Sequence, residues 1–400
     1  TDPDTSAVNR KPNIGMAFQA QRDYPSVDFS KSIMVGNSKS DIEFGNKLDM
    51  YTVLVGDKYE KEHKIYNSIN AYYENLHKFT YSDIYGGCIL NATISLYAYA
   101  NIEPRNDNKI VFRIPHTNEE YIFDSETELP ITNDKANLMK GIYNRIIKDF
   151  VNKPLSFTLT CALEVPFGSG LGTSSTLAVA ILGAYSEWLS LPLGEYDLAY
   201  LAYQIERIDL GQAGGKQDQY TAAFGGFNFM EFYADDKVIV NPLRVRNDTI
   251  NELSNNMLLY YTNSSRNSGD IIEKQQKNVK EQKAKSIEAM HQIKIQAYEI
   301  KEAILKNNLD EIGHILHSGW TYKKNMADGI TTPLFEKIYD TAINAGSSGG
   351  KISGAGGGGY VFFYCPENTR FAVMKALEQL GGKVQPYSFT KKGLETWHTR

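Results

Sequence analysis

The stretch Pro166-Phe-Gly-Ser-Gly-Leu-Gly-Thr-Ser-Ser175 combines closely spaced glycines with hydroxyl side chains, and an apolar run over residues 176–189 follows it directly. Glycine allows a backbone to turn tightly and to approach a ligand closely. A glycine-rich loop that leads into a helix directs free N–H groups and the positive end of the helix dipole at one point, which suits a phosphate. Ser and Thr are also favourable N-cap residues for that helix. The phosphate-binding candidates in this loop are Gly168, Ser169, Gly170, Leu171, Gly172, Thr173, Ser174 and Ser175.

An ordinary tight turn before a buried helix would have a similar composition, and the residues alone leave that alternative open. A Walker-type loop is excluded because no Gly-Lys-Ser/Thr sequence follows the glycines. The stretch resembles the second motif of the GHMP kinases, which is roughly Pro-x-x-x-Gly-Leu-Gly-Ser-Ser. This resemblance implies that the loop binds the phosphates of ATP.

Two carboxylates follow the loop in the sequence. Glu206 lies near the end of an amphipathic segment, and Asp218 lies just after a glycine-rich turn. Phosphoryl transfer depends mainly on positioning and charge neutralisation, and two carboxylates a short turn apart can divide the roles of metal ligand and base. On the residues alone, a solvated helix end made by Glu206, Arg207 and Asp209 is the stronger alternative.

The GHMP resemblance gives these residues roles. It implies that Glu206 and Ser174 hold Mg²⁺ and that Asp218 faces the substrate hydroxyl as the catalytic base. The segment Lys351-Ile-Ser-Gly-Ala-Gly-Gly-Gly-Gly359 resembles the third motif of the family, whose backbone packs beside the phosphate loop. Its phosphate-binding candidates are Gly356 and Gly357. ATP and Mg²⁺ are therefore the implied cofactors.

The resemblance covers residues 81–400 and implies an α+β fold of two lobes, which are ribosomal S5-like over residues 80–240 and ferredoxin-like over residues 241–400. Hydrophobic periodicity predicts the elements around the site. These are a helix over 137–151, an edge-like strand over 155–163, a helix over 195–210 closed by Gly211, a long helix over 280–306 and a last strand over 383–389.

Residues 1–79 are predicted to form a partial α/β unit and a tether. Apolar strands are expected over residues 32–36 and 51–55, with a helix over residues 39–48 between them, which is a βαβ pattern. Residues 57–79 are charged and rich in Tyr, so we expect a helix or a tether there.

Two short sequences in this N-terminal segment, Arg10-Lys11-Pro12 and Val35-Gly-Asn-Ser-Lys-Ser-Asp41, resemble the third and fourth motifs of HAD-type phosphatases of the heptose-bisphosphate kind. Asn37 stands where an Asp is usual, and the nucleophile motif of those phosphatases is not found. We therefore expect no aspartyl-phosphate chemistry from this segment, and a structural or degenerate remnant is the favoured interpretation.

From Tyr81 the sequence resembles the opening of a GHMP sugar kinase without its first strand and its sugar-contacting loop. We therefore hypothesise that further residues belong between Phe79 and Tyr81. A Cα–Cα distance across this junction well beyond the trans-peptide value would support the hypothesis, and an unbroken chain would contradict it.

Three stretches resemble the heptose 7-phosphate kinase branch of the family, with L-fucose kinases more distant: Ile89-Leu-Asn-Ala-Thr-Ile94, Gly214-Gly-Lys-Gln-Asp-Gln-Tyr220 and Phe224-Gly-Gly-Phe-Asn228. This implies transfer of a phosphoryl group from ATP to D-glycero-D-manno-heptose 7-phosphate, giving the 1,7-bisphosphate, in the synthesis of nucleotide-activated heptose for lipopolysaccharide or glycan. A phosphorylated substrate requires a cationic partner. The candidate substrate contacts are Asp83, Lys216, Arg266 and Lys351.

Three alternatives remain open at the level of sequence. One is another GHMP sugar kinase of the fucose or galactose type, and another is a bifunctional kinase with heptose-bisphosphate phosphatase activity. The third is a sugar sensor without catalysis, against which the presence of both Glu206 and Asp218 argues.

Composition limits the partners and the compartment. The 400-residue chain has a formal net charge of −5, so it shows no basic footprint for nucleic acid. Its three cysteines are scattered without metal-ligand spacing, which fits a reducing cytoplasm. No run of 18 apolar residues predicts a membrane span. The expected partners are ATP and a small sugar phosphate, and a homodimer is compatible with the family resemblance. His314 and His317 share a helical face and are predicted to be structural.

Overall fold

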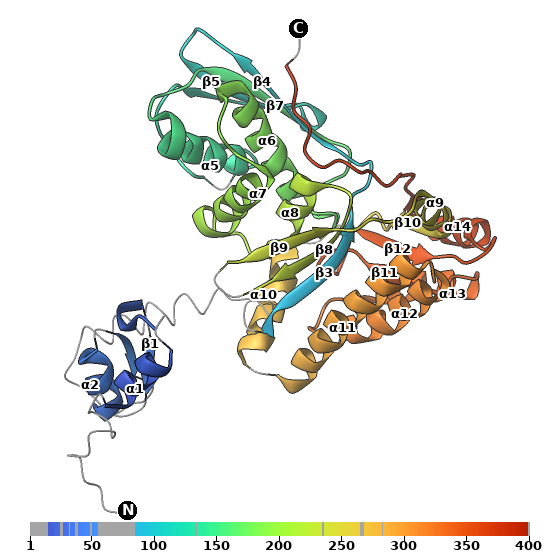
Figure 1. Cartoon of the computed structure of the whole chain (residues 1–400). Coiled ribbons are helices and arrows are strands. Elements are labelled where there is room, and N and C mark those ends of the chain that lie inside the picture. Colours follow the sequence, from blue (N-terminus) through green and yellow to red (C-terminus); the bar gives the residue numbers. More distant parts are fainter. Residues whose placement is uncertain are drawn as a thin grey trace, which may run out of the picture. The chain divides into compact units, whose positions relative to one another are not determined.

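The computed structural model describes residues 15–24, 27–31, 33–36, 39–48, 50–54, 85–132, 134–233, 236–264, 268–281 and 283–398. The chain divides into two compact units, one over residues 1–79 and the other over residues 80–400 (Figure 1). Each unit has its own sheets and its own apolar core.

The first unit confirms the predicted βαβ pattern. Its elements are α1 (Gly15–Asp23), the short 3₁₀ helix η1 (Phe29–Lys31), β1 (Ile33–Gly36), α2 (Lys39–Asn46) and β2 (Tyr51–Leu54). Strands β1 and β2 pair in parallel, with α2 as the connection between them. The buried side chains of Ala17, Phe44 and Leu48 form a small core. Residues 10–12, Asn37 and residues 57–79 lie outside the described residues, so the predictions made for them stay untested.

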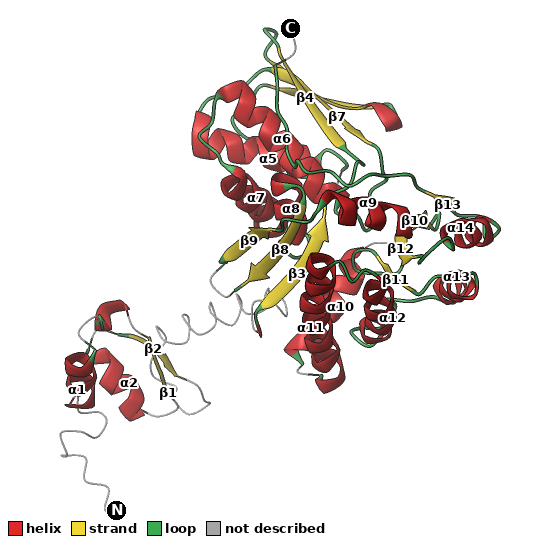
Figure 2. Cartoon of the chain, turned by 45° about the vertical axis from the view of Figure 1, so that its right-hand side comes forward, coloured by secondary structure: helices red, strands yellow, loops and turns green. Residues whose placement is uncertain are grey.

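The second unit begins with a lobe built on a four-stranded sheet in the order β4-β7-β5-β6. The strands are β4 (Ala98–Pro104), β5 (Lys109–Ile114), β6 (Glu119–Asp124) and β7 (Phe157–Leu163). Helices α5 (Asn137–Ile146) and α6 (Thr173–Leu189) pack against it (Figure 2). Alternate residues of β5 and β7 point into this core because successive side chains of a strand face opposite sides, and the most buried of them are Ile110, Phe112, Phe157 and Leu159.

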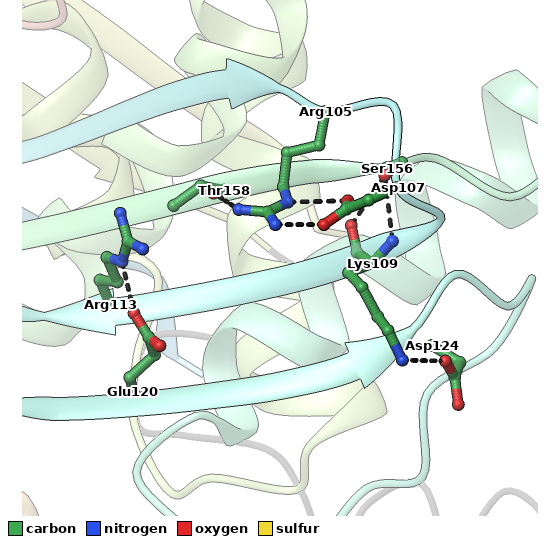
Figure 3. Close-up of polar contacts among 8 residues, drawn as sticks. All are labelled: Arg105, Asp107, Lys109, Arg113, Glu120, Asp124, Ser156 and Thr158. Carbon is green, nitrogen blue, oxygen red and sulfur yellow. Dashed lines mark hydrogen bonds and ion pairs between the residues drawn. The ribbon is translucent and has the colours of Figure 1, made fainter.

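The prediction that the strand leading into the phosphate loop is edge-like is wrong. Strand β7 lies between β4 and β5, pairing with the first antiparallel and with the second in parallel. Its outward-facing hydroxyls gave it the pattern of an edge strand. Thr158 is nevertheless buried, because Arg105 Nη1 donates a hydrogen bond to its Oγ1 at 3.2 Å (Figure 3).

The other polar contacts on this sheet are cross-strand ion pairs. Lys109 lies opposite Asp124, with Nζ 2.6 Å from Oδ1, and Arg113 lies opposite Glu120, with Nε 2.5 Å from Oε2 (Figure 3). The charged groups are substantially exposed, so each pair contributes about 1 kcal/mol or less. The pairs therefore favour the register of the β5–β6 hairpin more than they stabilise the lobe.

A three-stranded antiparallel sheet in the order β3-β8-β9 follows, made of β3 (Gly87–Ala92), β8 (Phe227–Phe232) and β9 (Val238–Pro242). Gly86 precedes β3 and Gly225-Gly226 precede β8, and all three have positive φ, so each of these strands follows a turn that glycine favours. Helix α11, a helix of the C-terminal lobe, packs along β3 (Figure 1).

The C-terminal lobe has the order β11-β12-β10-β13, with all neighbours antiparallel. Its strands are β10 (Met257–Tyr261), β11 (Gly349–Ile352), β12 (Tyr360–Tyr364) and β13 (Lys383–Val384). Its helices are α9 (Asn247–Asn256), α10 (Ser268–Lys280), α11 (Ala284–Lys306), α12 (Asp310–Lys324), α13 (Pro333–Asn344) and α14 (Arg370–Glu378). Counted along the chain, this is the 4-1-3-2 order of a ferredoxin-like sheet, which confirms the predicted α+β class.

Two element boundaries differ from the prediction. The long helix begins at Ala284 rather than at Lys280, which ends α10, because Lys283 is extended at ψ 104°. The last strand shrinks to Lys383–Val384 because Pro386 has no N–H to continue the ladder. The chain then leaves the sheet and forms an isolated bridge between Phe389 and Ile94 of the first lobe.

Two predicted helices end in π turns. Helix α5 continues as the π helix η3 (Ile147–Val151), and α7 (Glu195–Tyr203) continues as the π helix η4 (Gln204–Asp209). Leu198, Leu201, Ala202 and Ile205, which recur at helical spacing along this segment, are all buried. Among the helices in the described ranges, none combines the length and apolar character needed to cross a membrane.

Candidate active site

The glycine-rich loop connects β7 to α6. Gly168, Gly170 and Gly172 have φ angles of +72°, +83° and +70°, which only glycine adopts without strain. Gly172 occupies the N-cap of α6 and no side chain caps the helix, so the favourable Ser and Thr caps are not used. The first N–H groups of α6 therefore keep the orientation that suits an anion.

The hydroxyl groups of the loop make two kinds of hydrogen bond, one within the loop and the other with the neighbouring side chains of Glu206 and Arg207. Ser169 and Thr173 are buried and hydrogen-bond to each other, with 3.0 Å between Oγ and Oγ1. Ser174 Oγ donates to Glu206 Oε1 at 2.8 Å, and Ser175 Oγ accepts from Arg207 Nη2 at 3.3 Å. Ser174 is thus the hydroxyl of the loop that reaches the helix carboxylate.

The loop between β11 and β12 packs directly on this phosphate loop. Ser353 Oγ donates to Gly170 O at 2.8 Å, and Tyr360 N donates to Ser169 O at 2.9 Å. A Cβ atom added at Gly170 would stand 2.7 Å from Ser353 O, and one added at Gly359 would stand 2.0 Å from Ser169 O. The two loops therefore meet backbone to backbone, at a distance that only glycine permits.

Gly356 and Gly357 are close to Ile330 and not to the phosphate loop in the contacts described next. Gly357 N donates to Ile330 O at 2.9 Å, and a Cβ atom at Gly356 would stand 2.9 Å from the same oxygen. The N–H of Gly357 is thus engaged inside the C-terminal lobe, and the phosphate-binding role expected for both glycines stays a prediction.

Lys323, on α12, is a contact of this loop that the sequence reading missed. Its buried Nζ donates to Ile352 O at 3.0 Å and to Gly354 O at 2.6 Å. Burial, and then the charge of Lys351, lowers the pKa of Lys323 well below its usual value. Its spacing of three from the buried Trp320 is the signal that places Lys323 on the inner face of α12.

Both candidate carboxylates lie close to the residues that join the phosphate loop to α6. The Glu206 side chain is 0 % exposed and accepts from Ser174 and from Gln219 Nε2, the latter at 2.6 Å. Asp218 is in the first turn of α8 (Gln217–Phe224), and a Cβ atom at Gly172 would stand 2.9 Å from its Cγ. The fold thus brings Ser174, Glu206 and Asp218 together, and full burial excludes a solvated helix end for Glu206.

Burial raises the pKa of Asp218, the positive charge of Arg207 lowers it, and the charge of Glu206 raises it. Arg207 is the second residue that the sequence reading missed. Its Nε donates to Gly215 O at 3.2 Å, its Nη1 lies 3.7 Å from Glu206 Oε1, and its side chain is only 13 % exposed. Arg207 therefore supplies the positive charge beside both carboxylates. Its indirect signal in the sequence is the glycine at position 214. A Cβ atom there would stand 2.5 Å from Arg207 Cζ, so the main chain can approach the guanidinium only without a side chain.

These donors fit Mg²⁺. The metal prefers carboxylate and other hard oxygen ligands and is usually bound by one or two carboxylates together with substrate phosphates. Gln219 Oε1 is buried and has no hydrogen-bond partner, although the same amide donates to Glu206. Within the described ranges no group of three His, Cys, Asp or Glu could hold a metal by itself, so nucleotide phosphates and water would complete the shell.

The structure describes a contact for one of the two histidines predicted to be structural. His317 Nδ1 lies 3.0 Å from Tyr339 Oη, a contact inside the C-terminal lobe.

Of the four candidate substrate residues, the structure describes Lys216 and Lys351. Lys216 is buried, forms an ion pair with Asp236 and lies 5.1 Å from the centre of the Tyr203 ring. Lys351 is partly buried on β11, and burial lowers its pKa. Asp83, Arg266 and the junction between Phe79 and Tyr81 lie outside the described residues.

Comparison with known proteins agrees with this geometry. The family model of the GHMP kinases N terminal domain matches residues 137–226, and that of the GHMP kinases C terminal domain matches residues 300–383. D-glycero-alpha-D-manno-heptose 7-phosphate kinase from Campylobacter jejuni is 47 % identical over 317 residues, which cover 79 % of this chain and 93 % of that protein. The chain belongs to the GHMP kinase family. A HAD-hydrolase-like family model matches residues 8–77.

Solved structures extend the likeness to the fold. A D-glycero-D-manno-heptose 1-phosphate kinase from Bacteriodes thetaiotaomicron superposes with a TM-score of 0.67 at 43 % identity, covering 80 % of this chain and 93 % of that one. A putative sugar kinase from Campylobacter jejuni gives 0.65 at 47 % identity, covering 78 % and 89 %. The two-lobed GHMP fold and the enzyme class, an ATP-dependent phosphotransferase, are thereby confirmed.

Arg207→Met should shift the pH dependence of activity. The substitution removes the charge that lowers the pKa of Asp218 and leaves Glu206, which raises it, so the carboxylate should take up a proton at higher pH. A base works only when ionised, so the acidic limb of kcat/KM should move to higher pH. Profiles of kcat/KM for the wild type and the variant test this, with Arg207→Lys as the control that keeps the charge. An acidic limb that stays in place or moves to lower pH would contradict the assignment.

Ser174→Ala should weaken Mg²⁺·ATP without unfolding the protein. The substitution removes the hydroxyl proposed to hold the metal beside Glu206. Losing a polar contact to a charged group costs roughly 1.5–3 kcal/mol, so KM for Mg²⁺·ATP should rise about tenfold or more. Thr176→Ala is the matched control, because Thr176 Oγ1 donates to the main-chain oxygen of Gly172 rather than to a carboxylate. Wild-type kinetics in Ser174→Ala, at an unchanged melting temperature, would mean that the hydroxyl has no part in binding the nucleotide.

Proposed function

We propose that this protein transfers the γ-phosphoryl group of Mg²⁺·ATP to D-glycero-D-manno-heptose 7-phosphate and forms the 1,7-bisphosphate. The observation that carries the chemistry is the contact of Asp218 with Gly172, which places a carboxylate against the helix N-terminus where the phosphates would bind. The choice of substrate is supported by the heptose 7-phosphate kinase that is 47 % identical over most of its length.

Each residue of the site has one task in this proposal. The loop from Gly168 to Ser175 binds the phosphates through its N–H groups, and Ser174 with Glu206 holds the metal. Bound Mg²⁺ neutralises charge on the phosphates. Asp218 accepts the proton of the attacking hydroxyl, and its raised pKa strengthens it as a base. Arg207 lies beside Glu206, and its positive charge opposes the rise in the pKa of Asp218.

The substrate's own phosphate requires a cation. Arg266, Lys351 and Lys216 are proposed for this phosphate, and Asp83 is proposed as a further substrate contact. Lys216 would have to exchange Asp236 for the sugar phosphate, since the two form an ion pair. Because one relative is named as a 7-phosphate kinase and another as a 1-phosphate kinase, the position of this phosphate is the point to test.

A phosphatase is the second candidate function, favoured by the HAD-hydrolase-like match and the parallel β1–α2–β2 unit. Asn37 stands where those phosphatases usually have Asp, so the proposal assigns no hydrolysis to this segment.

We place the protein in the cytoplasm, which suits its free Cys88, Cys161 and Cys365, in the synthesis of nucleotide-activated heptose. The expected homodimer stays a prediction that light scattering can test.

A phosphotransfer screen tests the proposed function. The full chain is given Mg²⁺·ATP with heptose 7-phosphate, heptose 1-phosphate, mannose, fucose or galactose, and ADP and the sugar product are measured. Heptose 7-phosphate should give the 1,7-bisphosphate with the highest kcat/KM. A preference for heptose 1-phosphate, fucose or galactose would overturn the substrate assignment. Release of phosphate from the 1,7-bisphosphate would instead support the bifunctional alternative.

Asp218→Asn should lower kcat by about 10²–10⁴-fold, the usual contribution of a general base. Asn retains the shape of the side chain and loses the negative charge. Affinity for Mg²⁺·ATP should change little, because Glu206 and the glycine loop do not need Asp218 to bind it. A kcat within a few-fold of the wild type would refute the role of base, and a large loss of Mg²⁺·ATP affinity would make Asp218 a metal ligand.

A further inference from the structure

A cluster of polar side chains connects helix α5 to the π turn that carries Glu206. Arg145, on α5, donates from Nη1 to Asp209 Oδ2 and from Nη2 to Gln204 Oε1, both at 2.8 Å. Its Nε donates to Asp149 Oδ2, in the π turn that ends its own helix. Gln204 and Asp209 are the first and last residues of the π helix that carries Glu206. One guanidinium therefore bridges both ends of that turn.

The π turn decides where Glu206 points. Leu210 N donates to Ile205 O at 2.9 Å, five residues back, and Gln212 N donates to Glu206 O at 2.9 Å. Ile205 and Glu206 are neighbours in sequence and both are fully buried, the first in the apolar core and the second against Ser174. With regular α-helical spacing each N–H would bond four residues back, which would rotate the segment around its axis. Single π turns are rare and occur mostly at functional sites.

We propose that Arg145 is a positioning residue that holds the π turn of residues 204–209 and so directs the Glu206 carboxylate toward Ser174. The inference rests on the proposed function only in taking Glu206 as the metal ligand. Arg145 itself does not contact the phosphate loop in any of its hydrogen bonds.

The chemistry of the side chain suits this task. A guanidinium offers five N–H donors in a rigid planar fork, so one group can hold two acceptors at a set separation. A lysine is a flexible point charge and can hold only one of the two ends well. The ion pairs are partly exposed, with Arg145 22 % and Asp209 36 % exposed, and such pairs add little to global stability. The effect of Arg145 should therefore appear in the geometry of the turn rather than in the melting temperature.

The experiment uses the full chain and two readouts. Hydrogen–deuterium exchange of the peptide that covers residues 204–212 is measured without metal or nucleotide, and the affinities for Mg²⁺·ADP and for ADP alone are measured by calorimetry. In Arg145→Met this peptide should exchange faster while the other helices keep their protection. Affinity for Mg²⁺·ADP should fall about tenfold or more, as is typical when a residue that orients a metal ligand is removed, and affinity for ADP alone should stay near the wild type.

Asp149 and Asp209 provide a matched pair of variants. Asp149→Asn and Asp209→Asn each take one carboxylate from Arg145, but only Asp209 belongs to the turn that carries Glu206. Asp209→Asn should reproduce the faster exchange and the weaker Mg²⁺·ADP binding, and Asp149→Asn should not. Arg145→Lys should fail to restore the wild-type values.

Unchanged exchange and unchanged Mg²⁺·ADP affinity in Arg145→Met would overturn the proposal, as would equal effects of the two Asp variants. If Arg145→Met does not fold, the comparison of Asp209→Asn with Asp149→Asn decides. The exchange readout needs no substrate. A wild type that does not phosphorylate heptose 7-phosphate would therefore refute the proposed substrate and leave the test of the turn intact.

Discussion

Backbone contact between two glycine-rich loops is the constraint on which the active site depends. One loop precedes α6 in the first lobe and the other lies between β11 and β12 in the second, almost 200 residues later in the chain. They approach so closely that a single methyl group at Gly170 or Gly359 would collide with a main-chain oxygen. The phosphate loop is thus supported by the opposite lobe. The β11–β12 loop of that lobe is itself held by the buried amine of Lys323, which donates hydrogen bonds to its main chain.

Charge is the second constraint. Two carboxylates near one phosphate site would repel each other and the nucleotide, and burial increases the cost for Asp218. Arg207 offsets this by placing a guanidinium beside Glu206 and against Ser175. The N-terminal end of α6 adds a favourable field for anions. Both charges favour the ionised form of Asp218 next to a polyanion, which its proposed role as base requires.

Much of this could be predicted from the sequence because the motifs are local. The order of the glycine loops, Glu206 and Asp218 predicted the two-lobed fold, and the burial of Glu206 against Ser174 agrees with the metal-binding pair that the resemblance implied. Residues that act through tertiary contacts were missed. For Lys323 and Arg207 the sequence holds only indirect signals, the spacing of Lys323 from Trp320 and the glycine at position 214. Their partners are main-chain oxygens and side chains that only folding brings together. The π turn was not predicted either. Its hydrogen bonds span five residues instead of the four of an α-helix, and hydrophobic periodicity does not resolve this difference. Strand β7 was predicted to be an edge strand because its Thr side chains are polar, a pattern that does not reveal its pairing with both β4 and β5.

The most direct test of the central claim is a crystal structure of the protein with Mg²⁺ and a non-hydrolysable ATP analogue. The account predicts phosphates against the N-terminus of α6 and a metal ion about 2.0–2.1 Å from Ser174 Oγ and from a carboxylate oxygen of Glu206. Asp218 should lie outside the coordination shell and face the open side of the γ-phosphate. A metal bound by Asp218 instead, with the Ser174–Glu206 hydrogen bond still intact, would contradict the account.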